Sequence, residues 1–324
     1  MISARPEALL LAAMLAGPAQ AARPKPPPPL PPLELPGNAP ILPVEIAGQT
    51  VRLTVDLGGD PFVMLAPAAA ARLNLAAAQR PDGAKVDRRV LRVAVGQASI
   101  MVPYTREALR IDGRSLIGPV LTPAAAPGGA AAGSDGTIGL PLLPHDRVTL
   151  VFRPATPADR PLRLAARASG GSGSLAFAWR LPGQPGIEVE LHHLRPDSVA
   201  SVAAASSLAS AGAGQLRGPV RRVEIGFGVA RPVRVLRLER PVAVAGLPLN
   251  RVEVRLFDWA GRSQLPPDAD GNDDGLTVTG SRGRQRGWPI LKLGRDVLAG
   301  CASIGWQRDR SGDGGDFELR CPAG

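Results

Sequence analysis

The sequence is poor in aromatic residues, cysteine and histidine, and this composition already disfavours several classes of function. Phe, Trp and Tyr make up 3% of the 324 residues, so we expect an aliphatic core of Ala, Val and Leu. No Lys/Arg block alternates with aromatic side chains, which disfavours nucleic-acid binding despite a formal net charge of +10. The sequence also lacks a Gly-x-Ser-x-Gly elbow, a phosphate-binding loop and a dinucleotide fingerprint.

Proline and glycine, in contrast, are abundant. The chain has 35 Pro and 38 Gly, a composition that favours turn-rich β structure over long helices. Its length is sufficient for two domains of ordinary size.

The first forty residues have the composition of an export signal followed by a spacer. A weakly basic start, an apolar run over residues 8–16 and the small-residue site Ala19-Gln20-Ala21 predict a signal peptide over 1–21. The proline-rich residues 22–40 predict an extended tether. No later stretch is apolar enough to form a stable membrane span, so we expect a periplasmic or secreted protein.

The residues from 44 to 75 contain the most informative pattern. Two alternating apolar segments flank the Gly-containing turn Ala47-Gly48-Gln49-Thr50, which predicts a β-hairpin. The second segment leads into Asp56-Leu57-Gly58-Gly59, a strand Phe62–Leu65 and an Ala-rich helix Pro67–Leu75. The pattern therefore presents a carboxylate at a strand end, on a glycine loop.

This order of elements resembles the active-site segment of the retropepsin-like aspartic proteases of the pepsin superfamily. A second resemblance is the segment Asp135-Gly136-Thr137-Ile138-Gly139 with its trailing leucines, because in that family a similar segment passes beneath the catalytic loop. The resemblance implies an all-β, two-lobed acid-protease fold that arose by internal duplication and has only short helices. It implies no metal or organic cofactor.

An internal repeat supports the two-lobed interpretation. Landmarks of the first half recur in order in the second half. The matched pairs are Gly48-Gln49 with Gly183-Gln184, Leu73 with Leu208, Gly113 with Gly246, and Ile138-Gly139 with Leu293-Gly294. We therefore predict an N-terminal lobe at 41–167, a Gly/Ser-rich linker at 168–175 and a C-terminal lobe at 176–324.

The catalytic pattern is incomplete. The family's mechanism needs two carboxylates that share one proton and activate a water. The resemblance assigns Asp56 as the first, on a loop shaped by Gly58 and Gly59, but the repeat places Leu191 at the second position. Glu190, one residue away, is the possible second acid. The alternative role for Asp56 is structural, as an acceptor for backbone N–H groups in its own turn.

Leu57 also departs from the family pattern, which has a Thr or Ser after the aspartate. That hydroxyl forms a hydrogen bond between the lobes in the family, and leucine has no donor for it.

Three functional hypotheses follow. The protein is an aspartic-type endopeptidase that cleaves peptide or protein substrates, with the missing acid supplied by Glu190 or by a homodimer. Alternatively, it is a catalytically inactive family member whose interlobe cleft binds peptides. In the third hypothesis the fold is a scaffold, and its basic surface binds envelope polymers.

Two further features bear on stability and metal binding. Cys301 and Cys321 flank two expected strands and a turn, which predicts a disulfide; reduced thiols or a metal pair are the alternatives. Residues 270–275 resemble the first half of a calcium loop, but Ser281 stands where a bidentate Glu belongs. An acidic surface loop is the alternative for that segment.

Overall fold

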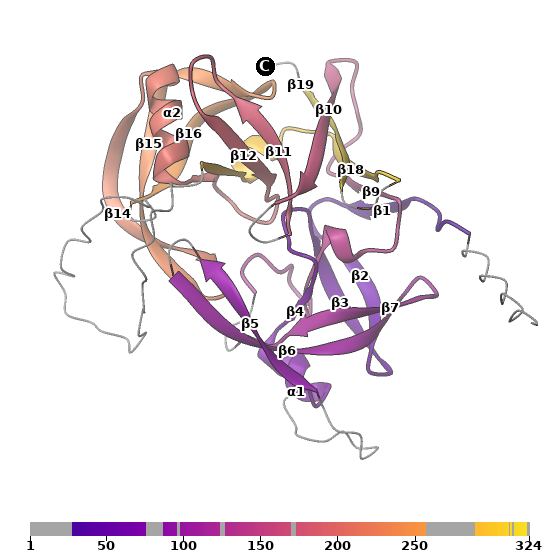
Figure 1. Cartoon of the computed structure of the whole chain (residues 1–324). Helices are drawn as coiled ribbons and strands as arrows, with labels where there is room; N and C mark the ends of the chain where they lie inside the picture. The colour runs from indigo at the N-terminus through magenta and orange to yellow at the C-terminus, as the bar shows by residue number, and fades with distance from the viewer. Residues whose placement is uncertain are drawn as a thin grey trace, which may run out of the picture.

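The computed structural model describes residues 28–75, 87–95, 98–123, 127–169, 173–256, 289–310, 312 and 314–322. The described chain is mostly β-strand with short helices, which confirms the all-β prediction (Figure 1). The helical segments are α1 (Pro67–Arg72), the 3-10 turn η1 (Leu140–Leu142), α2 (Val202–Gly212) and α3 (Arg295–Leu298).

One sheet has seven strands and belongs to the first half of the chain. Its strands are β2 (Ile41–Ile46), β3 (Gln49–Asp56), β4 (Val63–Leu65), β5 (Arg88–Val95), β6 (Ala98–Ile111), β7 (Arg114–Leu121) and β8 (Gly136–Gly139). They lie in the order β2-β3-β8-β4-β7-β6-β5.

The second sheet has twelve strands. They are β1 (Leu33–Pro36), β9 (Arg147–Val151), β10 (Asp159–Ala168), β11 (Leu175–Arg180), β12 (Gly186–Leu191), β13 (Val199–Ala200), β14 (Gln215–Gly226), β15 (Val229–Val244), β16 (Leu247–Arg255), β17 (Ile290–Leu293), β18 (Ser303–Arg308) and β19 (Gly314–Pro322). Their order is β1-β9-β18-β19-β10-β11-β12-β17-β13-β16-β15-β14.

The predicted hairpin is formed by β2 and β3. Its two turn residues, Ala47 and Gly48, have φ values of 50° and 77°, the positive values that a tight two-residue hairpin turn requires. Along β3 the side chains of Val51, Leu53 and Val55 are fully buried. Their alternation with polar residues therefore fixes the register and places Asp56 at the end of the strand.

The same pairing pattern occurs in both halves. In the first half, β4 lies between β8, to which it is antiparallel, and β7, to which it is parallel. In the second half, β13 has the same relation to β17 and β16. The strands that precede them, β3 and β12, each run parallel to the shared neighbour, β8 or β17. A helix follows in each case, α1 after β4 and α2 after β13.

Two segments that we predicted to be connections take part in the twelve-stranded sheet. Within the predicted tether 22–40, residues 33–36 form β1, which pairs in parallel with β9. The two ends of the predicted linker 168–175, Ala168 and Leu175, pair with each other where β10 meets β11. Backbone hydrogen bonding explains both results, because each segment lies beside a strand whose backbone N–H and C=O groups need hydrogen-bond partners.

The core is a single cluster of mainly aliphatic side chains that draws on both halves of the chain. Two of the few aromatic residues, Trp306 and Phe317, pack against each other in it with ring centroids 5.2 Å apart. Within the described ranges, no helix combines the length and the apolar character needed to cross a membrane.

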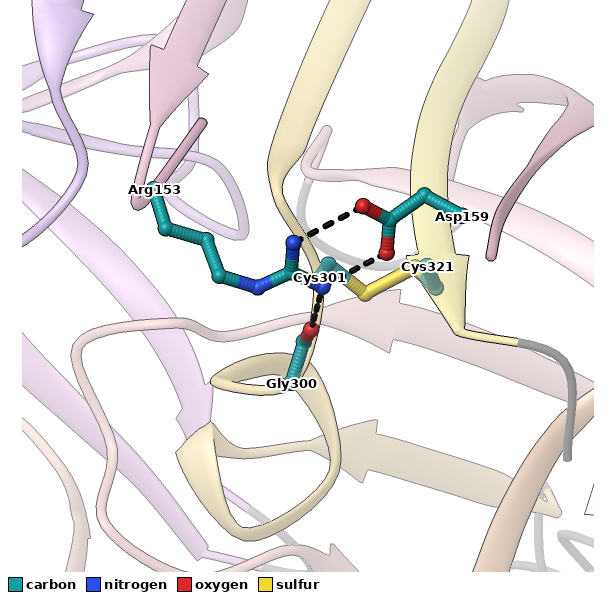
Figure 2. The surroundings of a disulfide bond; sticks show 5 residues. All are labelled: Arg153, Asp159, Gly300, Cys301 and Cys321. Atoms are coloured by element: carbon teal, nitrogen blue, oxygen red, sulfur yellow. Dashed lines mark hydrogen bonds and ion pairs between the residues drawn. A yellow bond between two sulfur atoms is a disulfide. The ribbon is translucent and has the colours of Figure 1, made fainter. Parts of the chain in front are cut away.

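The predicted disulfide is confirmed: Cys301, just before β18, is bonded to Cys321 in β19 (Figure 2). Beside it the Arg153 guanidinium donates two hydrogen bonds to the Asp159 carboxylate, at 2.8 and 2.6 Å, and a third to the Gly300 carbonyl at 2.7 Å. The Arg153 hydrogen bonds hold the pKa of Asp159 well below its usual range.

Candidate functional site

Asp56 lies half-exposed at the end of β3, where its own side chain stabilises the turn that follows. The Gly58 N–H donates to the Asp56 carboxylate at 3.1 Å, and the Gly59 N–H donates to the Asp56 backbone carbonyl at 3.2 Å. A short acidic side chain that accepts a backbone N–H two residues ahead forms an Asx-type turn. This geometry is the structural role that the sequence offered as the alternative to catalysis.

The glycines of this loop are required by close packing. A Cβ on Gly59 would lie 2.8 Å from the Gly139 Cα, and a Cβ on Gly139 would lie 1.7 Å from the Asp60 carbonyl oxygen. Neither distance is compatible with a side chain. The segment containing Gly139 therefore lies directly against the Asp56 loop, as the sequence resemblance predicted.

The third glycine contact joins the two halves of the molecule. A Cβ on Gly58 would lie 2.6 Å from the imidazole ring of His192, so the ring packs directly on the glycine backbone. Gly58 and His192 are both buried. The Asp56 loop is thus closed on one side by a histidine from the second half of the chain.

His192 occupies the position in the second half that corresponds to Asp56. The Arg195 N–H donates to the His192 carbonyl at 2.9 Å, as the Gly59 N–H does to the Asp56 carbonyl. The sequence repeat had placed Leu191 there, one residue too early; Leu191 is instead fully buried and pairs with Leu293 in the sheet. The correction follows from the hydrogen bonds, which fix a register that matched landmarks alone could not fix.

His192 belongs to a buried polar cluster that includes Glu190. A Glu190 carboxylate oxygen lies 2.7 Å from the His192 Nε2 and 3.1 Å from the Lys292 ammonium nitrogen. The Ser174 hydroxyl donates to the other carboxylate oxygen at 3.2 Å. β12 supplies Glu190, the adjacent strand β17 supplies Lys292, and Ser174 directly precedes β11.

The cluster fixes the charge of its members. Burial alone would raise the pKa of Glu190, but the charge of Lys292 and the hydrogen bond from His192 outweigh it and hold that pKa well below its usual range. The pKa of His192 is lowered, chiefly because burial disfavours the imidazolium form. At neutral pH the cluster therefore contains an ionised Glu190 carboxylate beside a neutral His192 imidazole.

His193 is also buried and points into a different environment. Its ring packs edge-on against Phe152 with centroids 6.3 Å apart, and neither ring nitrogen has a hydrogen-bond partner among the described residues. Burial lowers the pKa of His193 to about 4, although the negative charge of Asp56 acts in the opposite direction.

The hairpin formed by β14 and β15 contacts the other side of the Asp56 loop. At its tip, the ring of Phe227 packs against the ring of Phe62 with centroids 5.9 Å apart. The Arg195 guanidinium also donates to the Glu224 backbone carbonyl at 2.9 Å. In Figure 1 the hairpin extends from the α2 region towards the seven-stranded sheet. It therefore bridges the two halves beside Asp56.

Sequence reasoning identified Asp56, Gly58, Gly59 and Glu190, but it did not place His192 beside Asp56. It missed Lys292 and Ser174. The available signal for Lys292 was a single lysine inside an otherwise apolar strand sequence, Ile290-Leu291-Lys292-Leu293. Leu57, where the resemblance leads one to expect a Thr or Ser, is fully buried and packs in the core.

No group of three or more acidic, His or Cys residues that could hold a metal ion occurs in the part of the chain that the structure describes. The calcium-like segment 270–275 lies outside the described residues. No protein-family model and no curated protein matches the chain.

Proposed function

We propose that this chain is an exported, retropepsin-like protein that binds extended peptides between its two halves and does not hydrolyse them. The repeated strand pairing supports an origin by internal duplication, and it sets Asp56 and His192 at equivalent strand ends. The observation that carries the proposal is the histidine itself, because it stands where the two-aspartate mechanism needs its second carboxylate.

Glu190 is a poor substitute for that carboxylate. In the two-aspartate mechanism one acid stays protonated and polarises the scissile carbonyl, while the other activates water. The Glu190 carboxylate is paired with Lys292 and hydrogen-bonded to His192, and its pKa is strongly lowered. It therefore stays ionised through the acidic range in which a shared proton would be needed.

A second copy of the chain is a poor substitute as well. In a homodimeric aspartic protease, the partner's aspartate loop would lie against Asp56. Here the backbone of that loop, at Gly58, is already covered by the His192 ring of the same chain. The His192 ring and a partner's aspartate loop cannot both lie against Gly58. Homodimerisation therefore cannot complete the site without moving His192.

Export is part of the proposal. The disulfide between Cys301 and Cys321 supports it, because such bonds persist mainly in oxidising compartments. The signal sequence expected over 1–21 lies outside the described residues.

The test is a peptide library presented at acidic pH to residues 22–324 and to the Asp56→Asn variant. We expect no cleavage by either protein, read by mass spectrometry, and retention of a subset of peptides on both immobilised proteins. Circular dichroism checks that both are folded; in the Asp56→Asn variant the side-chain amide oxygen can still accept from the Gly58 N–H.

Two outcomes contradict the proposal. Cleavage that is lost in the Asp56→Asn variant would establish aspartic catalysis despite the histidine. Folded protein that neither cleaves nor retains any peptide would exclude a peptide-binding function.

A further inference from the structure

The hairpin that reaches the Asp56 loop carries a concentration of arginines on one face. In a sheet, residues that pair directly across strands point to the same face. Three rows of paired residues therefore share one face of β14, β15 and β16, namely Gln215–Arg237–Arg251, Arg217–Val235–Glu253 and Arg221–Val233–Arg255. The pair Val223–Arg231 lies on the same face. The arginines of this face, hereafter the arginine face, are Arg217, Arg221, Arg231, Arg237, Arg251 and Arg255.

The arginine face is turned away from the helix that packs on this sheet. The alternate residues of β15, Leu236 and Leu238, are buried, and they lie against Gly212 and Gly214 at the end of α2. Because successive strand residues point to opposite sides, Arg231 and Arg237 point away from α2. Figure 1 shows β14, β15 and β16 at the edge of the molecule.

Carboxylates on the protein balance only part of this charge. Arg221 is paired with Glu253, and Arg251 is paired with Asp197 at 2.6 Å. Arg231, half-buried, and Arg237, exposed, have no ion-pair partner within the described residues. Glu253 is the one acidic residue in the rows that define the face, and it is buried. A positive surface with few internal counter-charges attracts anionic ligands.

Protection of a sheet edge explains only some of these arginines. β14 is the terminal strand of the sheet, and edge strands often carry charges, proline and bulges that prevent pairing with other chains. Pro219 and the irregular pairing between Arg217 and Arg221 fit that role. Arg237 and Arg251 lie on the interior strands β15 and β16, where edge protection does not require them.

The arginine face is continuous with the candidate site. Arg231 lies close to the hairpin tip, because only the pairs Glu224–Ala230 and Gly226–Val229 lie between it and the tip. The tip itself carries Phe227 against Phe62. A peptide bound along the hairpin would therefore extend from the arginines to the Asp56 loop.

We propose that the peptide ligand is acidic, and that the arginine face binds its Asp or Glu side chains while a neighbouring part of the peptide reaches the Asp56 loop. This inference rests on the proposed peptide-binding function and adds the class of ligand. Arginine suits the role because its planar guanidinium forms paired hydrogen bonds with a carboxylate.

The experiment measures binding of a fluorescent twelve-residue Glu/Ala peptide and of its Lys/Ala counterpart to residues 22–324. The variant Arg231→Glu/Arg237→Glu reverses the two unpaired arginines. The matched control, Arg160→Glu/Arg180→Glu, reverses two exposed arginines on β10 and β11, which lie in the middle of the sheet order, away from β14, β15 and β16. Both variants change the net charge equally.

We expect the acidic peptide to bind, the basic peptide not to bind, and the Arg231→Glu/Arg237→Glu variant to bind the acidic peptide roughly tenfold more weakly. The control should change the affinity by less than about twofold. Equal weakening by both variants would mean a non-specific charge effect and would overturn the inference.

Two further arms separate the sources of binding. If inorganic polyphosphate of matched charge binds the wild type more tightly than the Glu/Ala peptide does, the face binds polyanions in general and the peptide assignment is wrong. If neutral library peptides bind and the Glu/Ala peptide does not, the inference fails while the proposed function stands. If no peptide of any charge binds, the proposed function itself fails.

Discussion

At the scale of single residues, the site is determined by which side chains can lie next to glycine. Gly58 has no side chain, and this allows the His192 ring to pack on the loop that carries Asp56. A side chain from the second half of the chain therefore lies directly against the Asp56 loop. Asp56 meanwhile accepts the Gly58 N–H within its own turn, which stabilises the loop.

His193 gives a residue-scale prediction about pH. Its pKa is about 4 in the folded protein, against about 6.5 when exposed. Below pH 6.5 the unfolded chain binds a proton that the folded chain does not bind, so the free energy of unfolding falls as pH decreases towards 4. Above pH 6.5 the imidazole is neutral in both states, so this loss of stability is absent.

Between pH 7.5 and pH 4.5, we therefore expect the free energy of unfolding of His193→Phe to fall by about 2 kcal/mol less than that of the wild type. Urea unfolding at both pH values measures this difference. Phenylalanine keeps the ring beside Phe152 and removes both unpartnered nitrogens. Identical losses in the two proteins would mean that His193 is protonated while folded.

At the scale of elements, the pair of parallel strands β12 and β17 holds the charged cluster. Glu190 and Lys292 are direct partners in the register of these strands. Buried ion pairs contribute little net stability, but removal of one partner leaves an uncompensated charge that is costly. The register of the two strands thus decides that Glu190 is neutralised by a lysine and not by a proton.

We expect Lys292→Met to lower the free energy of unfolding by about 3 kcal/mol, and the double variant Glu190→Gln/Lys292→Met to recover most of that loss. Urea unfolding of the wild type, both single variants and the double variant measures the coupling. The control is Arg147→Met, which breaks an exposed pair with Glu318 and should cost under about 1 kcal/mol. If the effects of Glu190→Gln and Lys292→Met on the free energy of unfolding are additive in the double variant, the two groups do not interact.

At the scale of the whole molecule, the twelve-stranded sheet joins the two halves. β9 and β10, from the first predicted lobe, pair with β18 and β19 from the end of the chain. β19 therefore holds residues of both predicted lobes in one sheet, and the disulfide anchors it to the start of β18. The relative position of Asp56 and His192 depends on this shared sheet.

Loss of the disulfide should weaken this junction. The bond closes a loop with a sequence separation of 20 residues, and a loop of that length corresponds to about 3 kcal/mol of stabilisation. We expect Cys301→Ala/Cys321→Ala to lower the free energy of unfolding by that amount, measured by urea unfolding, and dithiothreitol to have a similar effect on the wild type. A loss below about 1 kcal/mol would mean that strand pairing alone fixes β19.

The sequence alone predicted the features that depend on local pattern. Alternating apolar residues and the glycine-containing turn expected over Ala47–Thr50 predicted the β2–β3 hairpin, and the spacing of the two cysteines predicted the disulfide. The helix after β4 was predicted over Pro67–Leu75, and it ends three residues earlier, at Arg72. Such features follow from backbone geometry and side-chain alternation, which neighbouring residues determine.

Only the tertiary structure decided what faces Asp56. Matched landmarks placed Leu191 opposite it, and the hydrogen-bonded register replaced that residue with His192. The same contacts revealed Lys292 beside Glu190 and paired the two ends of the expected linker, Ala168 and Leu175, in the sheet. A shift of one residue reverses the face of a strand, and pairing between strands distant in sequence sets that register.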